Sequence, residues 1–214
     1  MLENVPLFAD LGETEREFIS SRAVTRVFPK NSVIINEGDT SDALYIVVSG
    51  RVKAYLSDED GKEIVLNTHG PGEHFGEMAL PDGAPRSASV ITLEKSKLAI
   101  ISRADLEDCL RRNPQIALQI IRGLSERLRV ATENVRSLAL LDVYGRVARL
   151  LLQLAEPEDD QLTIREKLTQ QDIADRVGSS REMISRILKD LRTGGYIEIE
   201  DKRITIKEKL PSAW

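Results

Sequence analysis

Few cysteines, histidines and aromatic residues occur in this 214-residue sequence, and the shortage excludes several kinds of site. Cys109 is the one cysteine, so no disulfide can form within the chain and an iron–sulfur cluster held by several cysteines is excluded. A single cysteine is also typical of proteins from a reducing compartment. The two histidines, His69 and His74, lack carboxylates and cysteines at the spacing of metal ligands, so we predict that both are surface or structural residues and that no metal site is present.

Long hydrophobic runs are missing as well. The longest, residues 138–141 and 150–152, are far too short to span a bilayer, and the first residues lack the basic and apolar regions of a secretory signal. With 41% hydrophobic and 30% charged residues, the composition is that of a globular protein. We therefore predict a cytoplasmic protein that does not contact a membrane.

No pattern for enzymatic catalysis is visible. One cysteine and two neighbouring histidines offer no Ser–His–Asp or Cys–His arrangement. Carboxylates cluster at residues 58–60 and 156–160, but these segments are predicted loops, in which acidic side chains are solvated. We predict that the protein has no catalytic residues and is not an enzyme.

Residues 24–101 have the pattern of a β-domain. Short apolar stretches alternate with turns that contain glycine or acidic residues, which is typical of a β-sandwich or β-barrel. A short helix is predicted within residues 1–20, with Thr14 and Glu17 at the spacing of a capping box. The predicted strands are residues 33–35, 44–48, 52–56, 64–66, 87–91 and 98–101.

A long helix is predicted to begin at Asn113–Pro114, a cap followed by a proline at the first helical position, and to end at about Leu140. Its apolar residues recur at alternating spacings of three and four. They form a heptad seam of Ile121, Leu124, Leu128, Ala131, Val135 and Leu138. The spacing fits two arrangements equally: two copies of the helix packed together, or one amphipathic helix lying on its own β-domain.

The chain after this helix predicts a compact α/β unit. Asp142 is placed to cap a helix over residues 143–154, and a polar, helix-breaking loop follows at residues 156–160. From Val143 onward the sequence has 13 Lys and Arg residues and 13 Asp and Glu residues, so the net charge of −5 belongs to the part before it. A neutral unit binds phosphates only if its positive charges gather on one face.

Two short helices joined by a glycine are predicted next. Thr169 with Asp172 has the spacing of a helix cap, and Gly178 supplies the positive φ of a tight turn. Ser179 with Glu182 repeats the capping pattern at the start of the second helix. The arrangement predicts a helix-turn-helix.

The second helix has one apolar and one polar face. At 100° per residue, its apolar residues fall between about 200° and 340° from Arg181. The polar face carries Arg181, Glu182, Ser185, Arg186 and Lys189. Arginine donates to guanine, glutamate accepts from cytosine, and lysine reaches phosphates, so the set fits duplex DNA. A solvated surface is the alternative, but the caps, the glycine turn and a predicted hairpin wing at residues 196–207 favour nucleic-acid binding.

Residues 75–89, called the cassette below, contain groups suited to a phosphate. Gly76 permits close approach of the backbone, Arg86 and Ser87 supply charge and donors, and Glu77 is an acceptor for a sugar hydroxyl. Taken alone, a glycine turn with one Arg–Glu pair more often has a structural role.

Beyond these patterns, the cassette resembles the phosphate-binding segment of cyclic nucleotide-binding domains, and residues 168–191 resemble the helix-turn-helix of the Crp/Fnr family of transcription regulators. The resemblance covers nearly the whole chain in one order. It implies an α+β fold: a jelly-roll β-barrel that senses a ligand at residues 1–112, a dimerisation helix and hinge at 113–141, and a winged helix-turn-helix that binds DNA at 142–214.

The resemblance also implies roles for individual residues. Glu77 would bind a ribose hydroxyl, while Arg86 and Ser87 would bind the cyclic phosphate. The implied ligand contacts are Gly76, Glu77, Arg86, Ser87, Ala88, Arg127 and Thr132. The implied DNA contacts are Thr169, Gln170, Ser180, Arg181, Glu182, Ser185, Arg186 and Lys189. The implied partners are duplex DNA, a second copy of the chain along the long helix, and RNA polymerase.

The resemblance favours cyclic AMP as the effector, without a covalent cofactor. Family members that respond to cyclic AMP have two adjacent hydroxylated residues facing the adenine, whereas this chain has Ala131 and Thr132. Cyclic di-GMP is the alternative ligand, because arginine stacks on guanine and the long helix carries Arg122, Arg129 and Arg136. Two further hypotheses are a regulator active without ligand and a ligand-binding module that does not bind DNA.

Overall fold

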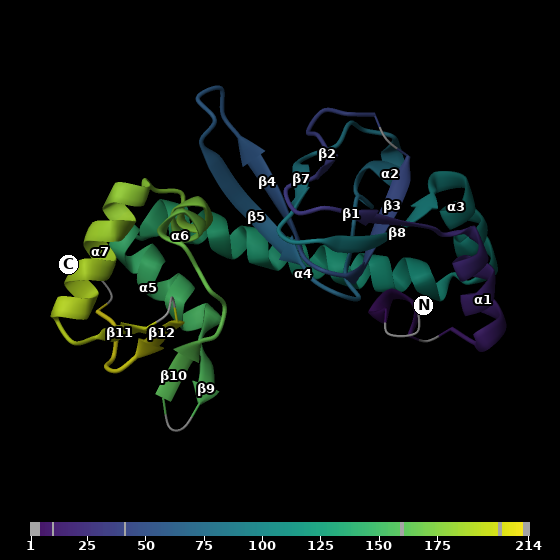
Figure 1. Ribbon diagram of the computed structural model, residues 1–214. Helices are drawn as coiled ribbons and strands as arrows, with labels where there is room; N and C mark the ends of the chain where they lie inside the picture. Colours follow the sequence, from purple (N-terminus) through teal and green to yellow (C-terminus); the bar gives the residue numbers. More distant parts are fainter. Residues whose placement is uncertain (1–4, 10, 41, 159–160, 201–202, 212–214) are drawn as a thin grey trace. The chain divides into compact units, whose positions relative to one another are not determined.

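The computed structural model describes residues 5–9, 11–40, 42–158, 161–200 and 203–211, and its contacts divide the chain into two units (Figure 1). The first unit comprises residues 1–56 and 65–129, and the second comprises residues 57–64 and 130–214. Helix α4 (Gln115–Leu140) contributes to both. Among the described residues, no helix combines the length and apolar character needed to cross a membrane.

Two four-stranded sheets build the first unit, with the strand orders β1-β8-β3-β6 and β2-β7-β4-β5. Val47, Val52 and Leu98 have no exposed surface and belong to a core that both sheets share. This confirms the predicted sandwich or barrel and the α+β class. The strands are β1 (Val24–Phe28), β2 (Val33–Ile35), β3 (Ala43–Ser49), β4 (Val52–Ser57), β5 (Glu63–His69), β6 (His74–Phe75), β7 (Ser89–Thr92) and β8 (Ser96–Ser102).

Helices cover the outer side of the first of these sheets. Their core includes Phe8, Ile19, Leu106 and Ile116, packed with Leu44 of β3. The helical elements are η1 (Pro6–Phe8), α1 (Glu13–Arg22), α3 (Arg103–Arg112) and the first part of α4. A further short helix, α2 (Ala79–Asp82), lies within the cassette.

Helix α4 has two apolar stripes. Ile116 is 1% exposed and, with the half-buried Ile120, packs against the helical core of the first unit. The centre of the heptad seam lies about 70° around the helix from this stripe. Its residues Ile121, Leu128 and Val135 are 55%, 68% and 66% exposed. The helix therefore packs on its own barrel and still presents the heptad seam on its surface.

The second unit joins three helices to one sheet of strand order β11-β12-β10-β9. Its core includes Leu151, Ile164, Ile184 and Leu191, none of which has exposed surface. The helices are α5 (Val143–Leu154), α6 (Gln170–Val177) and α7 (Arg181–Thr193). The strands are β9 (Glu156–Glu158), β10 (Gln161–Ile164), β11 (Ile197–Glu200) and β12 (Arg203–Ile206). Strands β11 and β12 form the predicted wing, whose residues 201–202 lie outside the described part.

Several predicted helix starts are confirmed and others are wrong. Asp142 caps α5, since its Oδ1 accepts from the amide of Gly145 at 2.7 Å. Thr14 does not cap α1, because the helix begins at Glu13 and its N-cap residue, Gly12, has no side chain to accept a hydrogen bond. Helix α4 begins at Gln115, one residue after the proline.

The N-cap of α7 is one residue later than predicted. Ser180 accepts from the amide of Met183 at 3.3 Å, whereas Ser179 belongs to the turn and donates its amide to the carbonyl of Ala174. The segment predicted as a loop at residues 156–160 contains β9, which pairs with β10. Pro157 is tolerated there because β9 is an edge strand, where a missing N–H costs no sheet hydrogen bond.

Candidate functional sites

The backbone at Gly76 allows the cassette to approach β3. Gly76 has a φ of +84°, and a Cβ at this position would lie 2.8 Å from Nη1 of Arg86 and 3.0 Å from the carbonyl oxygen of Ala43. Both the backbone conformation and the close approach therefore require glycine. Immediately before Gly76, Phe75 of β6 pairs with Tyr45 of β3, which fixes the register of this edge.

Arg86 is a buried cation held by backbone carbonyls. Its side chain is 3% exposed; Nη1 donates to the carbonyl of Gly76 at 2.5 Å and Nη2 donates to that of Ala43 at 2.8 Å. The guanidinium also lies 5.9 Å from the ring centroid of Tyr45. Burial lowers its pKa from the usual value, although a guanidinium remains charged. The barrel thus holds a positive charge in a fixed place.

Glu77 and Arg127 form an ion pair between the cassette and α4. Nη1 of Arg127 contacts Oε1 of Glu77, and Nη2 donates to the carbonyl of His74 at 2.5 Å. Glu77 is 3% exposed, and its Oε2 is buried without a hydrogen-bond partner in the described part of the chain. A buried acceptor without a donor is unfavourable, so this oxygen fits a donor that a ligand would supply.

A column of rings lies beside these groups. Tyr45 and Phe75 stack with centroids 5.1 Å apart, and His69 stacks on Phe75 at 5.7 Å. Burial, assisted by the charge of Arg127 and by His74, lowers the pKa of His69 to about 3. His69 is therefore neutral and acts as a packing residue. The ring of His74 is also largely enclosed, and burial lowers its pKa.

Not every predicted ligand contact takes part in this network. Ser87 is exposed, and its hydroxyl contacts Sδ of Met78 at 3.7 Å. Ala88 follows it, half-buried, before β7 begins. Thr132 is exposed and belongs to the second unit, so its role at the ligand stays a prediction.

In the second unit, α7 has the two faces that its sequence predicts. Ile184, Ile187, Leu188 and Leu191 are buried, and Met183 is half-buried. All of the polar set, Arg181, Glu182, Ser185, Arg186 and Lys189, is exposed, and in the described part of the chain no ion pair involves any of these five. Their hydrogen-bonding groups are consequently available to a partner.

The start of α6 lies close to this face. Thr169 and Asp172 form the predicted capping box: the Asp172 amide donates to Oγ1 of Thr169 at 3.1 Å, and the Thr169 amide donates to Oδ2 of Asp172 at 2.7 Å. Gly178 ends the helix with a φ of +64°, as predicted for the turn. The two helices of the motif are thus fixed by caps and a glycine turn.

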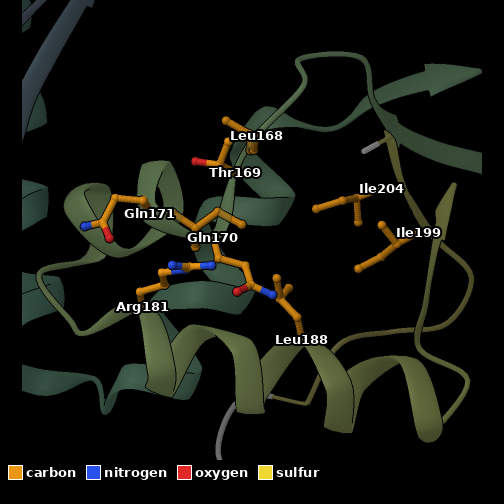
Figure 2. Close-up of a pocket in the computed structure, with 9 residues that line it drawn as sticks. Leu168, Thr169, Gln170, Gln171, Arg181, Leu188, Ile199 and Ile204 are labelled. Atoms are coloured by element: carbon orange, nitrogen blue, oxygen red, sulfur yellow. The ribbon is translucent and has the colours of Figure 1, made fainter. Parts of the chain in front are cut away.

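A pocket of about 600 Å³ lies between α6, α7 and the wing (Figure 2). Thr169, Gln170 and Arg181, all predicted DNA contacts, line it together with Gln171. Its apolar wall consists of Leu168, Ile173, Leu188, Ile199 and Ile204. Residues from two helices and the wing therefore border one concave surface.

Two groups in the barrel were missed by the sequence interpretation. The carbonyl of Ala43 and the ring of Tyr45 contact Arg86, yet both lie about forty residues before it, on strand β3. A backbone carbonyl leaves no signal in a sequence. Tyr45 carries only the weak signal of an aromatic residue in an alternating strand.

Comparison with known families gives two matches. The family described as the cyclic nucleotide-binding domain matches residues 25–113, and the family described as the Crp-like helix-turn-helix domain matches residues 145–209. The first match contains the cassette and the second contains α6, α7 and the wing.

The similar proteins are transcription regulators, and the similarity extends along most of both chains. A CRP-like cAMP-activated global transcriptional regulator of Mycobacterium tuberculosis is 37% identical over 85% of this chain and 83% of its own. The cAMP-activated global transcriptional regulator CRP of Salmonella typhimurium is 35% identical over 89% of this chain and 92% of its own. Among solved structures, the c-di-GMP responsive global regulator CLP of Xanthomonas campestris has a TM-score of 0.81 at 29% identity, covering 92% of this chain and all of the other. The catabolite activator protein of Thermus thermophilus has a TM-score of 0.58 at 32% identity, covering 95% and 94%.

Proposed function

The chain belongs to the Crp family of transcription regulators, which are DNA-binding proteins and not enzymes; from this premise we propose that a cyclic nucleotide, in the first place cyclic AMP, binds in the barrel of a cytoplasmic homodimer and controls its affinity for a specific duplex DNA sequence. The observation that carries the proposal is the pair of buried charged groups in the cassette. Arg86 offers a fixed cation, and Glu77 offers an acceptor without a donor.

These two groups are complementary to the two polar parts of a cyclic nucleotide. The ribose hydroxyl donates to Oε2 of Glu77, and the anionic phosphate accepts from Arg86, Ser87 and the amide of Ala88. Gly76 lets the cassette pack closely against Arg86 and β3, because a side chain at this position would meet both. Thr132 is the proposed partner of the base.

Ligand binding reaches α4 through Arg127, since this side chain already contacts the carboxylate that the ribose uses. A ligand hydroxyl that donates to Glu77 competes with Arg127 for the negative charge of this carboxylate. It thereby favours one packing of α4. The ligand regulates DNA binding only if it binds one of two such states more tightly, by a few kcal/mol.

Cyclic AMP is favoured because the relatives from Mycobacterium tuberculosis and Salmonella typhimurium are cAMP-activated. Cyclic di-GMP is the second candidate, favoured by the c-di-GMP responsive regulator of Xanthomonas campestris. The exposed arginines of α4, Arg122, Arg129 and Arg136, are the groups that would stack on its guanines.

The DNA site proposed is the exposed face of α7. Arg181, Glu182 and Arg186 contact base edges, and Ser185 and Lys189 flank them. Thr169, Gln170 and Ser180, at the starts of the two helices, contact phosphates. In a homodimer packed along the heptad seam of α4, two copies of α7 enter successive major grooves about 34 Å apart. On the bound promoter, the dimer contacts RNA polymerase.

Calorimetry of the purified protein with cyclic AMP, cyclic GMP and cyclic di-GMP, alongside DNA-binding assays, tests this function. We expect saturable binding of cyclic AMP that raises DNA affinity, and loss of both in Arg86→Leu. Arg26→Leu on β1 is the matched control, because Arg26 is exposed. A response retained in Arg86→Leu would show that the cassette is not the site. Binding of cyclic di-GMP alone would replace cyclic AMP as the ligand and leave the DNA assignment intact.

A further inference from the structure

Within the second unit, two arginines of α5 bind the end of α4, residues 130–140. Nη2 of Arg149 pairs with the carboxylate of Glu133 at 2.9 Å, and its Nη1 donates to the backbone carbonyl of Glu133 at 3.3 Å. Nη1 also donates to the hydroxyl of Ser137, which is only 8% exposed. One side chain of α5 thus contacts two successive turns of α4.

Arg146, one turn earlier on α5, connects the same region to the helix-turn-helix. Its Nη1 donates to the carbonyl of Leu141, the residue directly after α4, at 2.9 Å. Its Nε donates to the carbonyl of Val177, the last residue of α6, at 2.8 Å. Arg146 and Arg149, called the α5 clamp here, therefore join α4, α5 and the turn before α7 by directional bonds.

Apolar packing contributes little to this junction. The core of the second unit contains residues of α5, α6, α7 and the sheet, but in the described part of the chain it contains none of α4. Val135 and Leu140 at the end of α4 are 66% and 75% exposed. Leu138 lies beside Gly178, since a Cβ on that glycine would be 3.5 Å from Cδ2 of Leu138.

We propose that the α5 clamp consists of positioning residues for DNA recognition, which set the angle between α4 and α7 and hence the spacing of the two copies of α7 in a dimer. An apolar contact tolerates sliding, whereas hydrogen bonds to carbonyls weaken steeply when the angle changes. The common core of α5, α6 and α7 passes the orientation of the clamp to α7. This inference rests on the proposed function, because it requires a dimer on a two-fold symmetric site.

Spacing preference is the readout that separates positioning from stability. A duplex site is first selected from a random pool with the wild-type protein, with and without cyclic AMP. Affinity is then measured for that site, for one half-site, and for versions with one base pair inserted between the halves. Each inserted pair moves the second half by about 3.4 Å and turns it by about 35°. A rigidly held pair of helices discriminates strongly against such a change.

The variants are Arg149→Met and Arg146→Met, which keep an apolar stem but lose the bonds. Ser137→Ala is a milder change that removes one acceptor of Arg149. Arg165→Met is the matched control, because Arg165 also pairs with a glutamate, Glu158 at 3.4 Å, but makes no ion pair with α4 in the described part of the chain. We expect the clamp variants to lose about tenfold or more of the spacing preference while half-site affinity changes less than about twofold, and the control to match the wild type.

Clamp variants that keep the full spacing preference would overturn the inference. It would also be overturned if half-site and full-site affinities fell equally, since that is the result of simple destabilisation. Wild-type protein that binds a two-fold site without any spacing preference would exclude a clamp as well. In contrast, wild-type protein that selects no duplex DNA would contradict the proposed function itself.

Discussion

Arg127 of α4 contacts Oε1 of Glu77, 50 positions earlier in the chain, and leaves Oε2 of that buried carboxylate without a hydrogen-bond partner in the described part of the chain. The pair therefore does two things. It attaches α4 to the cassette, and it orients a carboxylate whose second oxygen remains open to a ligand.

The strength of this pair is measurable without any ligand. In a double-mutant cycle of Glu77→Gln and Arg127→Met, we expect a coupling free energy of unfolding of about 1–3 kcal/mol, because the carboxylate is buried. Glu126 and Arg129 provide a control pair on the same helix, 3.7 Å apart and largely exposed, with an expected coupling below about 1 kcal/mol. Urea unfolding of the four proteins in each cycle gives the values. Equal coupling in the two pairs would contradict the structural role given to Arg127.

Gly76→Ala should be more damaging than a change at another glycine with positive φ. The substitution adds backbone strain and also places a Cβ 2.8 Å from the guanidinium of Arg86 and 3.0 Å from the carbonyl of Ala43. Gly61→Ala is the control, because Gly61 has a φ of +77° but nothing lies within 4 Å of its Cβ position. We expect about 1 kcal/mol for the control and at least about 2 kcal/mol for Gly76→Ala, measured by urea unfolding. Similar losses would mean that the close approach at Gly76 relaxes easily.

Local patterns predicted most of this architecture, and the errors have physical causes. The cap at Asp142, the capping box of Thr169 and the two faces of α7 depend on neighbouring residues, so spacing alone predicted them. Strand β1 was missed because most of its side chains are exposed, which hides the alternation of a half-buried strand. Helix α2 was missed because it has only four residues and contains Pro81.

Contacts between distant segments could not be predicted from the sequence. Arg86 donates to the backbone carbonyl of Ala43, and the position of that carbonyl depends on the pairing of β3 with β6. Arg149 donates to Glu133 and Ser137, and these partners depend on how α5 folds back on α4. In both cases the sequence identifies a charged residue but not its partner, because nothing in the local pattern encodes a long-range contact.

Stability in acid should depend on His69. Its folded-state pKa of about 3 is below the unfolded value near 6.5, so the unfolded chain binds the proton first and stability is lost as the pH falls below about 6.5. From pH 7 to pH 5 this one group should cost about 2 kcal/mol. His69→Phe retains a ring for the stack on Phe75 and should remove that part of the loss. Urea unfolding of wild type and variant at both pH values provides the test; parallel losses would assign the acid sensitivity to other groups.

The exposed face of α7 makes a prediction about sequence preference. Arg181→Ala or Glu182→Ala should relax the choice of base at one position of each half-site, at a cost of about 1–3 kcal/mol, because each side chain makes its own base contact. Arg192→Ala is the control, since Arg192 is exposed in the last turn of the same helix. Selection of sites from a random duplex pool measures the preference. An unchanged selected sequence in both variants would rule out base contacts by these two residues.

A charged substitution in the heptad seam of α4 tests whether the seam is a dimer interface. Val135→Glu places a carboxylate in the seam, where a homodimer would bury two of them side by side, so the dissociation constant of the dimer should rise at least about tenfold. Val27→Glu on β1 is matched in exposure, 56% against 66%, but lies outside α4 and should leave the dimer unchanged. Sedimentation equilibrium gives both constants.

Helix α4 packs on its own barrel through Ile116 and Ile120, so the seam substitution should leave the unfolding free energy of the first unit within about 0.5 kcal/mol of the wild type. That second measurement separates the two arrangements that the heptad spacing permits. A dimer that survives Val135→Glu, combined with a less stable barrel, would mean that the seam packs within one chain. A weakened dimer with an intact barrel means that the surface stripe of α4 joins two chains and the stripe at Ile116 joins the helix to its own.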